Sequence, residues 1–274
     1  MKPQSSDWGF AFPSIGFIGL AIANAFFFAN LNEGITTQRR TNMESNLDVQ
    51  KVKHTQLMAS VLRVAKEPNE ANWEACHKLI ADGADINLKL SNGLSVIGSM
   101  IVNRNDTSVQ RELAVTKALL DLGANPREMN DYNQNLLLMC ADTNKDLVAK
   151  LLVERGADIN QEDMEGVSPL TASIYRKNDE MVEFYLNNPN IDLEQVDGRN
   201  NTPLHIAAMM GNSTVASMLI ERNPELIDKC NEDGLSAAAV AKQNRHLELG
   251  NTLESMEMVR LNETIEQETF EMTM

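Results

Sequence analysis

The sequence predicts an all-α protein, a solenoid of about six helix-turn-helix units, preceded by a hydrophobic N-terminal segment. Two observations lead to this prediction: a motif that returns at a fixed step along the chain, and an apolar run without charge near the N-terminus. The 274 residues are 43% apolar and 23% charged, which is the composition of a folded chain and not of a disordered one. The self-similarity of the chain decides its domain organisation.

Related short motifs begin at Gly166, Asn200 and Gly234, so that successive copies lie 34 residues apart. A second signature, Gly-Ala-Asp-Ile-Asn or a close variant, runs out of phase with the first and begins at positions 83, 123 and 156, with steps of 40 and 33 residues. Because one unit cannot bury its own apolar face, neighbouring units are expected to stack. The expected units are 54–89, 90–130, 131–163, 164–197, 198–231 and 232–256.

The fifth unit carries the clearest local signals. Thr202 is a good N-cap and Pro203 suits the first helical turn, so this pair predicts the start of a helix. His205 is expected to point back toward Thr202 and to brace that turn, which is a structural role. A glycine after a helix, as at the second signature, fits a left-handed C-cap.

Residues 197–208 read Asp-Gly-Arg-Asn-Asn-Thr-Pro-Leu-His-Ile-Ala-Ala, and this stretch resembles the ankyrin repeat, a unit of about 33 residues with the signature T-P-L-H-x-A. The resemblance covers the six units from 54 to 256, about three quarters of the chain, and implies an ankyrin repeat domain at residues 43–256. The first and last units depart from the motif, as capping units do. It implies a non-enzymatic protein-protein interaction module, a scaffold or adaptor whose partners are one or more proteins.

In that family, partners bind along the hairpin tips and the exposed faces of the first helices. Carried over by position, the resemblance implies partner-binding residues at the tips and on the first helices. Those at the tips are Tyr132, Gln134, Met164, Glu165, Val167, Arg199 and Asn201, and those on the first helices are Tyr175, Arg176, Met209 and Met210. For each of them the alternative is a plain surface residue, and Met209 and Met210 have the further alternative of packing between units.

The sequence contains no pattern typical of a catalytic, cofactor-binding or metal site. The four His and three Cys are dispersed, and the phosphate-binding, G-x-S-x-G and H-E-x-x-H motifs are missing. We therefore expect no enzyme, no cofactor and no metal, with a regulatory subunit of an enzyme as the alternative. The 24 basic against 39 acidic residues, a net charge of −15, argue against nucleic-acid binding.

Residues 8–31 form an apolar run within a stretch that has no charged residue, and as a helix this run would be about 36 Å long, enough to cross a membrane. The favoured interpretation makes 1–42 a membrane anchor with a short linker. The basic residues that follow the run then place the repeats in the cytoplasm. One alternative is a cleaved signal peptide, which gives a secreted or periplasmic protein. The others are a hydrophobic flank docked on the domain and a start at Met43, which gives a cytoplasmic protein.

Two segments depart from the regular repeat. An insertion near 103–109 accounts for the 40-residue step, and it is either a plain surface loop or a recognition loop. The acidic tail 257–274 follows a cap helix with a weak apolar stripe, and we expect this helix to fray into a flexible end. The alternative for the tail is a short motif that another protein recognises.

Overall fold

The computed structural model describes residues 46–89, 93–103 and 108–273, which lie in one compact unit, Ser45–Met274. These residues form helices and turns without a β-strand, apart from two isolated bridges, Met129 to Asn135 and Cys230 to Ser236. The all-α prediction is therefore confirmed for this part of the chain. Within it, no helix is both long enough and apolar enough to cross a membrane. The expected membrane helix at 8–31 lies outside the described residues.

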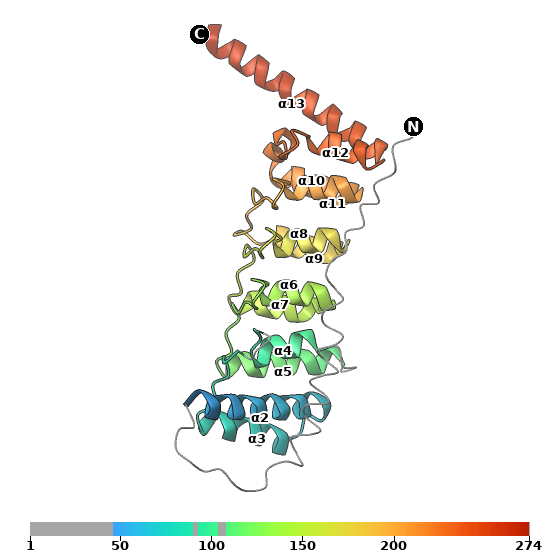
Figure 1. The fold of residues 1–274 in the computed structure, drawn as a ribbon. Helices are drawn as coiled ribbons and strands as arrows, with labels where there is room; N and C mark the ends of the chain where they lie inside the picture. The colour runs from blue at the N-terminus through green and yellow to red at the C-terminus, as the bar shows by residue number, and fades with distance from the viewer. Residues whose placement is uncertain (1–45, 90–92, 104–107, 274) are drawn as a thin grey trace, which may run out of the picture. The chain divides into compact units, whose positions relative to one another are not determined.

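The described helices form six hairpin-like pairs that stack in chain order (Figure 1). First helices pack on first helices, as α10 does on α8 and α12, and second helices pack on second helices, as α5 does on α7. The pairs are α2 (Asn46–Lys66) with α3 (Glu70–Ala81), α4 (Val96–Val102) with α5 (Val109–Asp121), α6 (Leu136–Thr143) with α7 (Asp146–Glu154), α8 (Pro169–Tyr175) with α9 (Asp179–Leu186), α10 (Pro203–Met210) with α11 (Ser213–Arg222), and α12 (Ala237–Gln243) with α13 (Leu247–Thr273); the 3-10 helix η1 (Pro224–Asp228) follows α11.

The start of α10 shows why these short helices form. Thr202 is the N-cap, Pro203 occupies the first turn, and the Nδ1 atom of His205 accepts a hydrogen bond from the Thr202 backbone N–H at 3.2 Å. Ser168 and Thr171 form the same kind of reciprocal cap at the start of α8. Such caps satisfy backbone donors that the first turn leaves open. The prediction that Thr202 and Pro203 start a helix and that His205 braces its first turn is confirmed.

Second helices end in a recurring turn, of which the end of α7 is an example. Gly156 has a φ of 90°, a left-handed conformation that an L residue adopts only with strain. Its N–H bonds the carbonyl of Val153 at 3.0 Å, and the N–H of Ala157 bonds that of Leu152 at 2.9 Å. The same bond pattern follows α3 and α5, which confirms the prediction of left-handed glycines after these helices.

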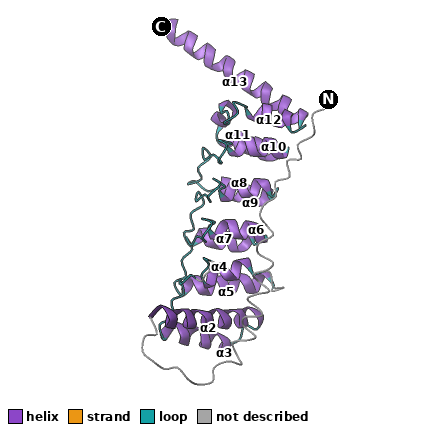
Figure 2. Cartoon of the chain, in the orientation of Figure 1, coloured by secondary structure: helices purple, strands orange, loops and turns teal. Residues whose placement is uncertain are grey.

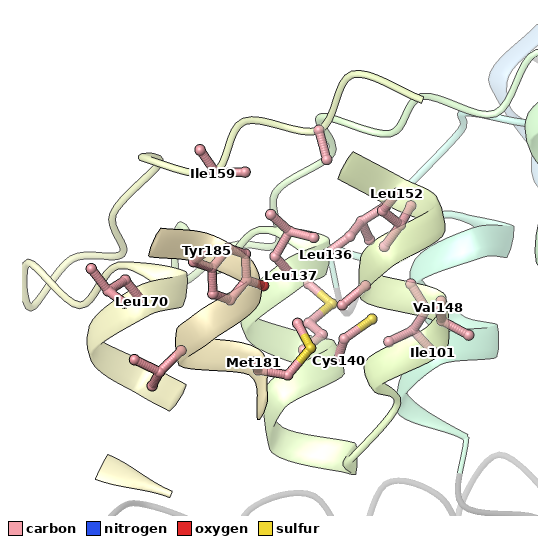
Figure 3. Close-up of a cluster of buried hydrophobic side chains, with 14 of the residues drawn as sticks. Ile101, Leu136, Leu137, Cys140, Val148, Leu152, Ile159, Leu170, Met181 and Tyr185 are labelled. Atoms are coloured by element: carbon pink, nitrogen blue, oxygen red, sulfur yellow. The ribbon is translucent and has the colours of Figure 1, made fainter. Parts of the chain in front are cut away.

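The core is a continuous layer of aliphatic side chains between neighbouring pairs. Figure 3 shows the part between the α6–α7 and α8–α9 pairs, where Leu137 and Cys140 on α6 lie close to Met181 and Tyr185 on α9. Cys140 is fully buried, and burial raises the pKa of its thiol. Ala207 and Ala208 on α10 are also fully buried, and side chains this small let short helices approach closely.

The longer loops that join one pair to the next gather along one edge of the stack (Figure 2). The insertion lies between α4 and α5, where it was expected, although residues 104–107 are outside the described part of the chain. The last helix differs from expectation: α13 continues to Thr273, so that residues 257–273 are helical where a flexible end was predicted. A frayed end was expected because the acidic composition gives little apolar surface for packing.

Candidate protein-binding surface

Four five-residue turns at the ends of the long loops share one backbone geometry. We call them the tip turns, and they comprise residues 130–134, 163–167, 197–201 and 231–235. In each, the Oδ1 atom of the first residue accepts the backbone N–H groups of the third and the fifth; for Asp197 the donors are Arg199 at 2.8 Å and Asn201 at 2.9 Å. The fourth residue is left-handed in all four. The turn conformation is thus fixed by its own side chain.

Neighbouring tip turns are hydrogen-bonded to one another. The N–H of Gly198 donates to the carbonyl of Glu165 at 3.1 Å, and the N–H of Glu232 donates to that of Arg199 at 3.0 Å. The Nδ2 atom of Asn231 also donates to Oδ1 of Asn201, at 3.0 Å. The last three turns therefore form one connected row, which holds the exposed side chains in fixed relative positions.

The sequence-predicted tip residues differ in how far they are accessible. Tyr132 and Met164 are 61% and 71% exposed, so their apolar side chains are open to a partner. Glu165 and Arg199 are exposed as well, whereas the remaining predicted tip residues, Gln134, Val167 and Asn201, are half-buried. Asn201 bonds Asp197 and Asn231, so it holds the row together.

The predicted first-helix residues occupy equivalent positions at the C-terminal ends of α8 and α10. Arg176 is exposed and pairs with Asp142, which lies at the corresponding end of α6. Tyr175 is half-buried; burial, and then the charge of Asp197, raises the pKa of its phenol to about 12. Met209 and Met210 are also half-buried, and Met210 packs against the core. For Met210, the alternative of packing between units therefore holds in part.

Tyr175 connects the two groups of predicted residues. Its phenol interacts electrostatically with Asp197, Arg199 and Glu165, which belong to two successive tip turns. The structure thus brings Tyr175, Glu165 and Arg199 into one neighbourhood. We call the exposed parts of the tip turns, together with the ends of α6, α8 and α10, the tip surface.

The tip surface is predominantly acidic. Around the second turn, Glu162 lies near Asp163 and Asp192, and burial together with these two carboxylates raises the pKa of Glu162. Asp131 adds exposed negative charge at the first turn, and Glu232 and Asp233 add it at the fourth. A cationic surface on a partner would therefore be attracted to it.

Several residues that build this surface were not among those predicted from the sequence. The first residues of the tip turns, Asn130, Asp163, Asp197 and Asn231, recur at steps of 33, 34 and 34 residues, and this spacing was a usable signal. Asn160, the last residue of the second signature, ties one loop to the next: its Nδ2 donates to Asn190 O at 2.7 Å and its Oδ1 accepts from Asp192 N at 3.0 Å. Asn87 makes the corresponding bonds to Gly123 and Asn125.

Two buried charged groups support α4, whose unit lacks the Thr-Pro start. The carboxylate of Glu128 accepts the backbone N–H of Ser95 at 2.7 Å and also the hydroxyl of Ser95, and burial raises its pKa. At the other end of α4, the Nζ atom of Lys145 donates to the carbonyls of Met100 at 3.3 Å and Asn103 at 3.0 Å. Neither contact follows from the sequence pattern, because both are formed by residues far along the chain.

Outside the tip surface, the described residues show few features of a catalytic, metal or ligand-binding site. Within residues 46–89, 93–103 and 108–273, no group of three His, Cys, Asp or Glu side chains is placed to hold a metal ion. A half-open groove of about 540 Å³ lies between α11 and the start of α13, and it is lined mainly by small and aliphatic side chains, among them Ala216, Ile220 and Leu253.

Comparison with known proteins agrees with this architecture. Residues 170–257 match the family model of ankyrin repeats, in three copies. Rabankyrin-5 from Mus musculus is 26% identical over 126 residues, which cover 46% of this chain and 11% of that protein, and the Homo sapiens protein of the same name is 25% identical over the same shares. Delta-latroinsectotoxin-Lt1a from Latrodectus tredecimguttatus is 37% identical over 79 residues, 28% of this chain and 6% of the toxin.

The chain thus spans only a small part of the length of these relatives, so their resemblance concerns the repeats and not the whole proteins. The matched residues run from α8 into the first part of α13, and they include the Thr202-Pro203 start of α10 and the connected tip turns 197–201 and 231–235. The same pairing of helices extends back to α2. Residues 170–257 are therefore ankyrin repeats.

Proposed function

We propose that this protein is a non-enzymatic interaction module that binds a partner protein on the tip surface. The main support is the exposure of Tyr132 and Met164 on turns whose backbone is fixed by internal hydrogen bonds. Aromatic and methionine side chains are enriched at the centres of interfaces, and a surface that is already ordered loses little entropy on binding. Ankyrin repeats are themselves a protein-binding architecture.

The charge of the surface indicates the kind of partner. The exposed carboxylates around the tip turns favour a basic protein surface, and they disfavour nucleic acid and anionic lipid. Arg199 and Arg176 are the basic residues among the predicted contacts, and both lie next to acidic groups. The expected complex therefore has apolar contacts at Tyr132 and Met164 within a rim of charge pairs.

Affinity capture with the full chain tests the tip surface. The double variant Tyr132→Ala, Arg199→Ala should lose the proteins that wild type retains, by at least about tenfold for a side chain at an interface centre. Leu147→Ala is the matched control, because Leu147 is exposed on the second helix α7, away from the tips. Equal capture by the double variant and by wild type would show that the binding face lies elsewhere.

We further propose that residues 8–31 tether the module to a membrane and that the repeats face the cytoplasm. The support is the sequence alone: 24 residues without charge, followed by Arg39, Arg40, Lys51 and Lys53. Fractionation of the full chain beside a 43–274 truncation is the test, and only the full chain should sediment with membranes. N-terminal sequencing of the mature protein separates a retained tether from a cleaved signal peptide, because cleavage after the Ala-Asn-Ala stretch would remove the first 25 residues.

A further inference from the structure

The last helix has two parts with different surroundings. In the first part of α13, Leu249 and Leu253 are buried, and this stretch packs against α12. Farther along, Arg260 pairs with Asp228 of η1, with Nη2 and Oδ2 2.9 Å apart. Beyond this ion pair the helix continues to Thr273, and the residues whose side chains are described there are exposed.

Three aliphatic side chains on either side of Arg260 share one face of α13. Met258 is 60% exposed, Leu261 55% and Ile265 51%. Their spacing of i, i+3 and i+7 places them within about 60° of one another around the helix axis. We call these three residues the α13 stripe. Leu249 and Leu253 project from another face of the helix, so the stripe does not belong to the core.

The spacing of the stripe indicates the shape of its partner. Residues at i, i+3 and i+7 correspond to successive a, d and a positions of a heptad, the pattern by which one helix receives the side chains of another. An extended strand would place its side chains at a two-residue period, which matches this row poorly. The occupant that fits is therefore a helix with an apolar face.

The charged residues around the α13 stripe indicate the charge of the partner helix. Glu257 and Glu266 border the stripe on opposite sides, and Glu254, which pairs with Lys242 of α12, lies in line with it on its N-terminal side. The Oε1 atom of Glu257 is shielded from solvent and has no hydrogen-bond partner among the described residues. A second copy of α13 would bring the same carboxylates together, and an anionic membrane would repel them. A helix with lysine or arginine beside its apolar face has the complementary charge.

We propose that the α13 stripe, Met258, Leu261 and Ile265, is a second docking surface and that it binds a basic amphipathic helix of a partner protein. This surface lies on the last helix and shares no residue with the tip surface. It gives the module a way to hold two protein segments at once, or one partner at two points, which would raise the overall affinity.

A synthetic helix serves as the probe: a labelled peptide of about three heptads with Ile and Leu at a and d and Lys at e and g. Fluorescence anisotropy with the full chain should show saturable binding. The double variant Leu261→Ser, Ile265→Ser should weaken this binding at least about tenfold, because two aliphatic contacts are lost. Val259→Ser is the matched control, since Val259 is 56% exposed on a different face of the same helix, and it should bind as wild type does.

Charge is tested separately. Glu257→Gln with Glu266→Gln should weaken binding several-fold and flatten its dependence on salt, and a peptide with Glu in place of Lys should not bind. Circular dichroism of each variant verifies that α13 stays helical. Wild-type affinity in the Leu261, Ile265 double variant would overturn the proposal.

Two further results would also overturn it. One is dimerisation of the full chain that the stripe variant abolishes, measured by sedimentation, and the other is stripe-dependent binding to vesicles containing phosphatidylserine. The tip variant Tyr132→Ala, Arg199→Ala should leave peptide binding unchanged. If it abolished peptide binding, the peptide would lie on the tip surface, and the α13 proposal would fail while the tip surface remained a binding site.

Discussion

The Nε2 atom of His205 lies 3.0 Å from the carbonyl oxygen of Leu235, so that one imidazole joins the start of α10 to the tip turn of the next unit. The Nδ1 atom of the same ring accepts from the backbone N–H of Thr202, which leaves the proton on Nε2 to donate to Leu235. Both bonds require the neutral imidazole in this one tautomer. The contact between neighbouring units therefore depends on the protonation state of a histidine.

Acidification should destabilise the protein through His205 and His54. Burial lowers the pKa of both imidazoles, so protonation favours the unfolded chain. Their contribution to stability is complete above the unfolded pKa of about 6.5 and is lost as the pH falls below it toward the folded pKa. The free energy of unfolding in urea should therefore fall between pH 8 and pH 5.5, and it should fall less in His205→Gln, which keeps an acceptor for Thr202. Parallel profiles for the two proteins would contradict this role of His205.

Glu128 should contribute to stability as a hydrogen-bond acceptor and not as a charge. Glu128→Ala leaves the Ser95 donors unpaired and should cost about 1–3 kcal/mol of unfolding free energy. Glu128→Gln keeps an oxygen for the Ser95 N–H and should cost much less. Because burial raises the pKa of Glu128, the ionised form is disfavoured in the folded state, and the wild type should lose stability relative to Glu128→Gln as pH rises. A larger loss in Glu128→Gln than in Glu128→Ala, measured by urea unfolding, would refute this explanation.

Lys145 should matter more than Lys150, although both form an ion pair. The Lys145 side chain is only 9% exposed and bonds two carbonyls at the end of α4 as well as Glu112. Lys145→Met should cost about 1–3 kcal/mol, since buried acceptors lose a charged donor. Lys150 pairs with the exposed Glu180, and Lys150→Met should cost less than about 1 kcal/mol. Equal shifts of the denaturation midpoint would show that capping by Lys145 contributes nothing.

Gly166 and Gly156 should differ in their tolerance of alanine. Both are left-handed, with φ of 76° and 90°, so either substitution introduces backbone strain of about 1 kcal/mol. A Cβ on Gly166 would also meet the Asp197 Cα at 3.0 Å, whereas a Cβ on Gly156 meets nothing within 4 Å. Gly166→Ala should therefore lower the melting temperature several degrees more than Gly156→Ala does. The opposite order would mean that the tip turns are not held in contact.

The repeated helix pairs were predictable because stacking imposes the same local requirements on each unit. The Thr202, Pro203 and His205 side chains meet these requirements at the start of a helix, and the glycines meet them after the second helices. Both features can be recognised in the sequence. The supports of α4 could not be predicted, because Glu128 lies 33 residues beyond Ser95, Lys145 belongs to the following unit, and neither residue is part of a motif. The full length of α13 was missed as well, since its second part has few buried contacts and its helical conformation depends on local propensity.

The candidate site was predicted less completely than the fold. The resemblance correctly located the tip turns, but exposure separates Tyr132 and Met164 from Asn201, which is engaged in bonds within the row. Sequence position alone gives no measure of exposure. The role of Tyr175 between two tip turns also needed the folded arrangement, because Glu165 and Arg199 belong to different units.

Site-specific photo-crosslinking tests most directly whether partners bind the tip surface. A photoreactive amino acid replaces Tyr132 or Met164 in the full chain, and replaces Leu147 as a matched exposed position on the second helix α7. Crosslinked protein adducts should form from positions 132 and 164 and be absent from 147. Adducts from position 147 alone, or equally from all three positions, would contradict the assignment of the tip surface as the binding face.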